Sequence, residues 1–252
     1  PGKKFLSWGL LLPFAVPAYV IAYVYTDLLE FAGPVQSSLR ALMGWTSSKD
    51  YWFPSIRSMG GAIIMMSLVL YPYIYMLARA AFLEQSVSLY RVTRSLGVSP
   101  IGFFIRVSLP IARPALAVGL SLVLMETLND YGTVDYFAVR TLTAGLYDTW
   151  LNMSNLSGAA QIAVLMVFVV VVLIVLERYS RRKQKQYHSR NQGDPIPTTE
   201  LTGLRGYLAS FLILLPILLG FIVPFFILSK YAYKNFSVSW DDKFLSYAFN
   251  SF

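Results

Sequence analysis

Long uncharged apolar segments are the feature that most constrains how this 252-residue chain can fold. The four segments without any Asp, Glu, Lys or Arg are residues 5–25, 58–78, 159–176 and 206–229. A transmembrane helix needs about 20 predominantly apolar residues, because each residue advances the helix by about 1.5 Å. A fifth segment, residues 114–133, is apolar in its first half and then contains two carboxylates. The sequence therefore predicts five transmembrane helices.

The composition favours a membrane protein over a soluble one. Hydrophobic residues make up 56% of the chain and charged residues only 13%, whereas soluble domains carry about 25% charged residues. A soluble bundle with buried core helices fits such long uncharged runs poorly. A cleaved signal peptide is a poor interpretation of residues 5–25, because no small-residue cleavage site follows and four further candidate spans do. We expect an all-α, polytopic helical membrane protein.

The basic residues fall mostly on one side if the five helices cross in alternation. That side receives the chain start, residues 79–113 and residues 177–205, which hold 14 of the 21 Lys and Arg residues but four of the 13 Asp and Glu residues. Excess Lys and Arg marks the cytoplasmic side of a membrane. We expect residues 26–57, 134–158 and 230–252 to face outward. Because the positive charge is divided among loops, we expect no nucleic-acid partner.

Residues 178–205 are polar and basic and then rich in proline, with too few apolar residues to fold alone. We expect this segment to be a flexible cytoplasmic linker between two membrane units. Its RRKQK run, residues 181–185, either contacts anionic lipid headgroups or is a merely solvated run of charge. The only histidine, His188, lies in this linker, and we expect it to be solvated.

The predicted cytoplasmic loop at residues 84–113 begins with the pattern of a short helix. Val87, Tyr90 and Leu96 are apolar at spacings that suit one face of such a helix. Gly97 suits the left-handed position that follows a helix end. The pattern therefore predicts a helix that stops at a defined elbow.

A second short helix is predicted directly after the elbow. Ser99 is a favoured N-cap residue, and Pro100 is a favoured first residue of a helix. The apolar stripe of this helix consists of Phe103, Phe104 and Val107. We expect the helix to end at Leu109–Pro110, just before the third span. Two short helices with a fixed elbow can transmit a push from a partner better than a loose loop.

The spacing from Gly97 to the run Val107-Ser108-Leu109-Pro110 resembles the cytoplasmic "EAA" loop of binding-protein-dependent ABC importer permeases. The resemblance implies a type I ABC importer transmembrane (MetI-like) fold. It also implies that the loop contains a coupling helix, which docks into a cleft on a separate ATP-binding subunit that is expected to be a dimer. The residues assigned to coupling in this way are Arg91, Thr93, Arg94, Leu96, Gly97, Ser99, Pro100, Phe103, Val107, Leu109 and Pro110.

One departure from the family pattern lies in the loop. The Glu-Ala-Ala triplet falls, by its spacing from Gly97, on Arg91-Val92-Thr93. A basic residue thus replaces the acidic one, so an ion pair made by the family's Glu is not expected here. The simpler alternative for the loop is an ordinary connection between helices with a helix cap.

The sequence around the loop resembles the ferric-iron permease subfamily more narrowly. The matching stretches are LARAAFLEQSVSLYRVTRSLGVSPIGFFIRVSLPIARPAL, METLNDYGTVDYFAV, TLTAGLYDTW and, near the start, AVPAYVIAYVYTDLLEFAGPVQSSLR. The resemblance implies ferric iron uptake across a bacterial inner membrane, with cargo delivered by a periplasmic substrate-binding protein. Thiamine, polyamine and sulfate remain alternative cargoes, because selectivity rests largely on the binding protein.

Ferric permeases of this kind fuse two permease halves in one polypeptide, so we expect this chain to be a fragment of such a protein. The expected later part of the first half is residues 1–177, with spans near 5–25, 58–78, 114–133 and 159–177. Residues 178–205 are then the linker, and residues 206–252 are the first span and outer loop of the second half.

Two carboxylates lie within the third predicted span. Glu126 and Asp130 are four residues apart and therefore share a helix face, with Asn129 beside them. A charged residue at the bilayer centre costs about 2.5–3.5 kcal/mol, so such residues usually face a cavity or a partner. Either these residues line the substrate pathway, or Glu126 forms an internal hydrogen bond and Asp130 lies at the outer interface.

Other functions fit less well. The sequence has no phosphate-binding loop of the G-x-x-x-x-G-K-[ST] type, so ATP hydrolysis must belong to a separate subunit. A proton-driven secondary transporter could use Glu126 and Asp130 as a relay but would not need the loop at 84–113. A membrane enzyme would need a cluster of nucleophiles, bases or metal ligands, and the chain has one histidine and no cysteine. We expect no catalytic residues, metal site or cofactor.

Overall fold

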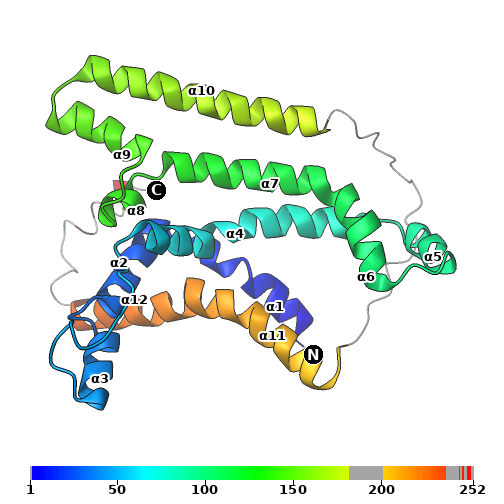
Figure 1. Cartoon of the computed structure of the whole chain (residues 1–252), viewed down its shortest axis with the longest axis horizontal. Helices are drawn as coiled ribbons and strands as arrows, with labels where there is room; N and C mark the ends of the chain where they lie inside the picture. The colour runs from blue at the N-terminus through cyan, green and yellow to red at the C-terminus, as the bar shows by residue number, and fades with distance from the viewer. Residues whose placement is uncertain (1, 182–200, 237–243, 245, 247–248, 251–252) are drawn as a thin grey trace.

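The structure, a computed structural model, describes residues 2–181, 201–236, 244, 246 and 249–250. Regular structure within those residues is helical throughout, without strands, which confirms the predicted all-α class (Figure 1). The predicted linker lies largely outside the described residues, as does most of the segment after Phe236.

Four long helices confirm four of the five predicted spans by length and apolar composition. They are α4 (Met59–Leu83); a continuous helix made of α6 (Pro100–Phe103), η2 (Phe104–Ser108) and α7 (Leu109–Asn129); α10 (Leu156–Arg181); and a second continuous helix made of α11 (Gly203–Ile217), η4 (Leu218–Ile222) and α12 (Val223–Lys234). The closest packing among them is between α4 and α7.

The fifth prediction, a single helix over residues 5–25, was wrong in its geometry. The segment forms α1 (Lys3–Gly9), a short 3₁₀ turn η1 (Leu12–Ala15) and α2 (Ala18–Leu29), and the chain direction changes by 90° between η1 and α2. Pro17 explains the break, because a residue before proline is driven into the extended region, and Val16 has φ −109° and ψ 120°. This segment crosses a membrane only if the bent pair counts as one broken span.

The predicted end of the second loop helix at Leu109–Pro110 was also wrong, because the helix continues into α7. A π-helical turn, η2, carries the chain past the proline, and the Leu109 N–H donates to the Phe104 carbonyl five residues back. Proline lacks an N–H, and its ring clashes with the carbonyl four residues earlier. The wider turn accommodates that ring. The same device recurs at η4, where the Val223 N–H donates to Leu218 directly before Pro224.

The segments that were predicted to share a side of the membrane lie at the same end of the helix bundle (Figure 1). One end holds α5 (Val87–Ser95), α6, the end of α10 and the start of α11. The opposite end holds α3 (Pro34–Met43), α8 (Gly132–Tyr136), α9 (Leu142–Tyr147) and η3 (Asp148–Asn152). The spans therefore alternate in direction, as the charge pattern predicts.

The best-buried side chains lie where α2, α4 and the segment around α8 meet. Ile21 and Ala22 of α2 pack with Met65 and Val69 of α4, and Phe137 closes the cluster from the end of α8. This core fixes the bent first segment against α4 at the end that carries the predicted outer loops.

We predict that Phe137→Ala destabilises the protein, because Phe137 is 1% exposed and its removal leaves a cavity. Loss of a buried Phe costs about 3–5 kcal/mol. The measurement is thermal unfolding of the detergent-solubilised protein. The matched control is Phe168→Ala on α10, where the ring is 63% exposed and the melting temperature should stay within a few degrees. Equal shifts for the two variants would contradict the assignment of the core.

Candidate functional site

The first helix of the loop, α5, ends in a Schellman motif. The Gly97 N–H donates to the Arg94 carbonyl at 3.0 Å, and the Val98 N–H donates to the Thr93 carbonyl at 3.3 Å. Gly97 has φ +79°, the left-handed region that the sequence predicted. The Arg94 guanidinium also donates to the Val98 carbonyl at 2.7 Å. This side-chain bond adds a third local hydrogen bond across the elbow.

The second helix starts at the predicted cap. The Ser99 hydroxyl accepts the Gly102 N–H at 3.0 Å, and Pro100 occupies the first turn. Four residues, 96–99, thus separate two helix ends that are both capped by local hydrogen bonds. The elbow is confirmed as a defined turn.

A pair of hydrogen bonds ties the base of the loop together. The Gln85 amide donates to the Ser108 carbonyl at 2.9 Å, and the Ser108 hydroxyl donates back to the Gln85 amide oxygen. Both side chains are buried. Because polar groups in such surroundings are costly to leave unpaired, this clasp holds the end of α4 against η2.

Aromatic packing fills the inside of the loop. The rings of Tyr90 and Phe103 meet edge to face with centroids 5.1 Å apart. The ring centroids of Phe82 and Phe104 are 5.7 Å apart. Thr93 is buried, and its hydroxyl donates to the Leu89 carbonyl at 2.7 Å. The two helices therefore form one packed unit.

The structure divides the predicted coupling residues into two groups. Buried or half-buried residues that support the loop are Thr93, Phe103, Val107, Leu109 and Pro110. Exposed residues at the tip are Arg91, Arg94, Leu96, Gly97, Ser99 and Pro100. Sequence reasoning missed Gln85 and Ser108, since no local pattern shows that residues 23 positions apart will bond.

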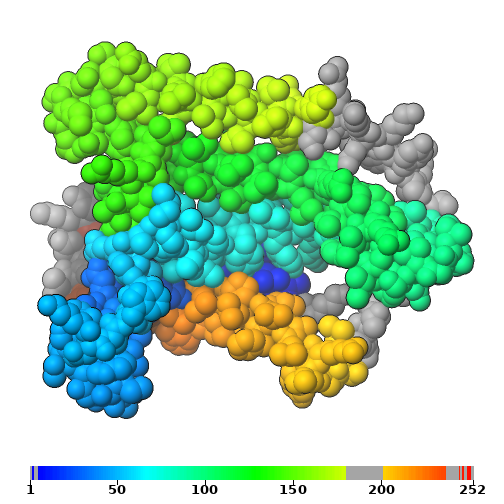
Figure 2. Space-filling model, in the orientation of Figure 1, coloured from blue at the N-terminus to red at the C-terminus, as the bar shows by residue number. Residues whose placement is uncertain are grey.

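We call the exposed tip the coupling surface and define it by Arg91, Val92, Arg94, Leu96 and Ile101. Leu96 and Ile101 are 77% and 73% exposed. The two arginines give the surface a positive charge. Figure 2 shows the loop as a lobe that projects from the end of the molecule.

The predicted pathway residues lie at the end of α7 and just beyond it. Asp130 lies just beyond Asn129, the last residue of α7, and its carboxylate accepts the N–H and the hydroxyl of Thr133, both at 2.8 Å. That carboxylate therefore fixes the turn into α8 at the outer end. Glu126 and Asn129 are exposed on α7.

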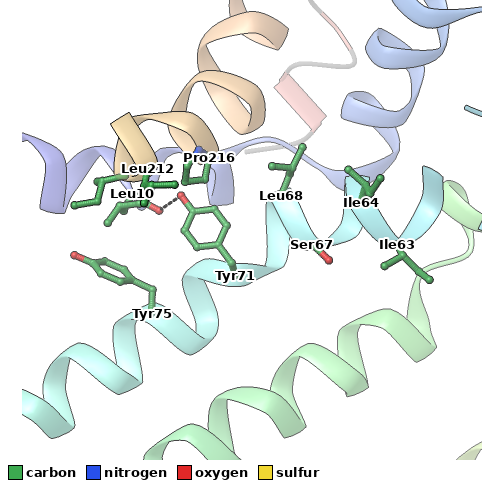
Figure 3. Close-up of a pocket in the computed structure, with 10 residues that line it drawn as sticks. Leu10, Ile63, Ile64, Ser67, Leu68, Tyr71, Tyr75, Leu212 and Pro216 are labelled. Atoms are coloured by element: carbon green, nitrogen blue, oxygen red, sulfur yellow. Dashed lines mark hydrogen bonds between the residues drawn. The ribbon is translucent and has the colours of Figure 1, made fainter. Parts of the chain in front are cut away.

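A hollow of about 500 Å³ lies between α4, the end of α1 and α11. Aliphatic side chains and the rings of Tyr71 and Tyr75 line it, as Figure 3 shows. No charged residue is among its lining residues in the described part of the chain, so it offers no anchor for an ionic cargo.

Comparisons with known proteins identify a family for most of the chain. Residues 1–185 match the family described as binding-protein-dependent transport system inner membrane component. This match includes the coupling surface, its clasp at Gln85 and Ser108, and the spans on either side.

Individual relatives differ in cargo. The Fe(3+)-transport system permease protein FbpB 2 of Haemophilus influenzae is 25% identical over 75% of this chain and 32% of its own length. The molybdenum transport system permease protein ModB of Escherichia coli K12 is 24% identical over 66% of this chain and 71% of its own. The putative 2-aminoethylphosphonate transport system permease protein PhnU of Salmonella typhimurium is 27% identical over 66% and 58%.

The chain thus spans about a third of the Haemophilus protein's length and larger fractions of the other two. The family match covers well over half of the 252 residues and contains the predicted loop and the spans that precede residue 185. The chain belongs to the family of binding-protein-dependent transport system inner membrane components.

Proposed function

We propose that this chain is the membrane-embedded part of an ATP-driven importer and receives the motion of a separate ATP-binding subunit at the coupling surface. The observation that carries the proposal is a stiff, capped elbow that presents exposed aliphatic and arginine side chains at the predicted cytoplasmic end. Family membership supports the same role. In this proposal the protein lies in a bacterial inner membrane, and a periplasmic substrate-binding protein delivers cargo to the outer end.

The covalent path from the elbow favours transmission across the whole bilayer. From Pro100 to Asn129 the chain is one unbroken helix of 30 residues. The clasp between Gln85 and Ser108 joins its base to α4, which packs along α7. A push on the coupling surface therefore displaces two packed spans together.

We predict that Leu96→Asp and Ile101→Asp each abolish binding of the ATP-binding subunit. Each places a charge in the apolar part of the surface, where its desolvation costs several kcal/mol. The measurement is co-purification of the subunit with the complete permease, together with nucleotide-driven uptake into proteoliposomes.

The matched control is Leu42→Asp, which changes an equally exposed leucine at the opposite end and should leave subunit binding intact. Retained binding and uptake in both loop variants would contradict the docking role. Uptake without any ATP-binding subunit would instead support a proton-driven secondary transporter.

Two substitutions in the elbow test whether its stiffness matters for coupling. Gly97→Ala forces a side chain into the left-handed region, at a cost of roughly 1–2 kcal/mol. Ser99→Ala removes a cap worth about 1 kcal/mol. Both variants should reach the membrane in normal amounts but transport fewer molecules per ATP hydrolysed, as measured in proteoliposomes. An unchanged ratio would show that elbow stiffness does not matter for coupling.

Ferric iron is the cargo that we favour, because the Haemophilus relative named for Fe(3+) transport matches three quarters of this chain. The exposed Glu126 carboxylate on α7 suits a cationic cargo better than an oxyanion. Molybdate, sulfate and phosphonates are the competing cargoes, by analogy with relatives named for their transport. Thiamine and polyamine remain further possibilities from the sequence resemblance alone.

The cargo is tested by uptake of radioactive iron, molybdate and sulfate into cells that contain the complete importer. We expect iron uptake only, with a severalfold decrease for Glu126→Gln. Asn129→Asp is the matched change on the same helix end and should preserve iron uptake. Uptake of an oxyanion, or stronger oxyanion uptake in Glu126→Gln, would overturn the assignment of iron.

A further inference from the structure

A tyrosine hydroxyl takes the place of a missing backbone donor at the π-helical turn in the last long helix. The Tyr25 hydroxyl of α2 donates to the Leu219 carbonyl of η4 at 2.6 Å, across 194 residues of sequence. Neither donor that follows can serve this carbonyl, since the Val223 N–H bonds to Leu218 and Pro224 has no N–H. Tyr25 is buried, so water does not compete for the bond.

A tyrosine hydroxyl also replaces a backbone donor at the break in the first segment. The Tyr71 hydroxyl of α4 donates to the Leu10 carbonyl at 2.7 Å (Figure 3). A 3₁₀ bond to that carbonyl would need an N–H on Pro13, and the Phe14 N–H is already bonded to Leu11. Each proline thus frees one carbonyl, and a tyrosine from another helix pairs with it.

The π-helical turn η4 and the 3₁₀ turn η1 also contact each other. A Cβ added to Gly220 of η4 would lie 2.9 Å from both the Cβ of Pro13 and the carbonyl oxygen of Leu68. Real Cβ atoms do not approach so closely, so only glycine allows η4 to pack on η1 and α4 here. Nearer the outer end, the Tyr231 hydroxyl donates to the Asp27 carboxylate and gives α12 a second bond to α2.

We propose that Tyr25 and Tyr71 are positioning residues whose hydroxyls replace the backbone donors that Pro224 and Pro13 remove, and that they fix where the last long helix crosses the bent first segment. A carbonyl without a partner is strongly disfavoured in hydrocarbon, so each pair has one stable register. The helix α11–η4–α12 is then held to α2 and α4 as part of one structural unit. This inference does not depend on the cargo or on the ATP-binding subunit.

The test is a double-mutant cycle of Tyr25→Phe and Pro224→Ala in the complete natural polypeptide. Tyr25→Phe removes the donor and should speed amide hydrogen exchange in residues 214–223 by about tenfold, because an orphaned buried carbonyl favours local opening. Pro224→Ala restores an N–H at the break. In that background Tyr25→Phe should change exchange less than about twofold.

Tyr207→Phe is the matched control, since Tyr207 is exposed on α11 and should not alter exchange at η4. If Tyr25→Phe alone fails to fold, recovery of its membrane level by Pro224→Ala supports the proposal, and no recovery overturns it. If Pro224→Ala alone fails to fold, the same comparison with Tyr71→Phe and Pro13→Ala decides. An equal effect of Tyr25→Phe in both backgrounds overturns the proposal.

Discussion

Every backbone carbonyl in a bilayer needs a partner, and this constraint accounts for most of the unusual geometry in the protein. Water is absent from the hydrocarbon region, so an α-helix that contains proline must find another donor or change its hydrogen-bond pattern. The chain does both. Wider turns precede Pro110 and Pro224, and tyrosine hydroxyls reach the carbonyls of Leu10 and Leu219. The wide turns and the bend in the first segment are therefore held by specific hydrogen bonds.

The end that holds α5 and α6 follows a different rule, since local capping is enough there. The Schellman motif at Gly97 and the Ser99 cap involve only neighbouring residues. The elbow can therefore hold its shape while it projects from the bundle. Only its base relies on a distant partner, through Gln85 and Ser108.

The sequence predicted what depends on short-range chemistry. Apolar length located the spans, and the order Gly97, Ser99, Pro100 located the elbow to the residue. It did not predict whether a proline would end a helix, as at Pro17, or be absorbed by it, as at Pro110. That outcome depends on whether the freed groups find partners in space.

The sequence also did not predict side-chain contacts between distant segments, because those contacts depend on which groups meet in space. Tyr25 looked like one of many aromatic residues near a span end, and nothing in its neighbourhood indicated Leu219. The spacing of the carboxylates at positions 126 and 130 did not indicate that Asp130 would pair with Thr133 at the helix end.

The unbroken run from Pro100 to Asn129 makes the chain behave as a lever. At 1.5 Å per residue, 30 helical residues extend about 45 Å. A rotation of the helix by about 5° about one end therefore moves the other end by about 4 Å. The π-helical turn η2 and Pro114 both lie in this run, and they are the places at which it can bend.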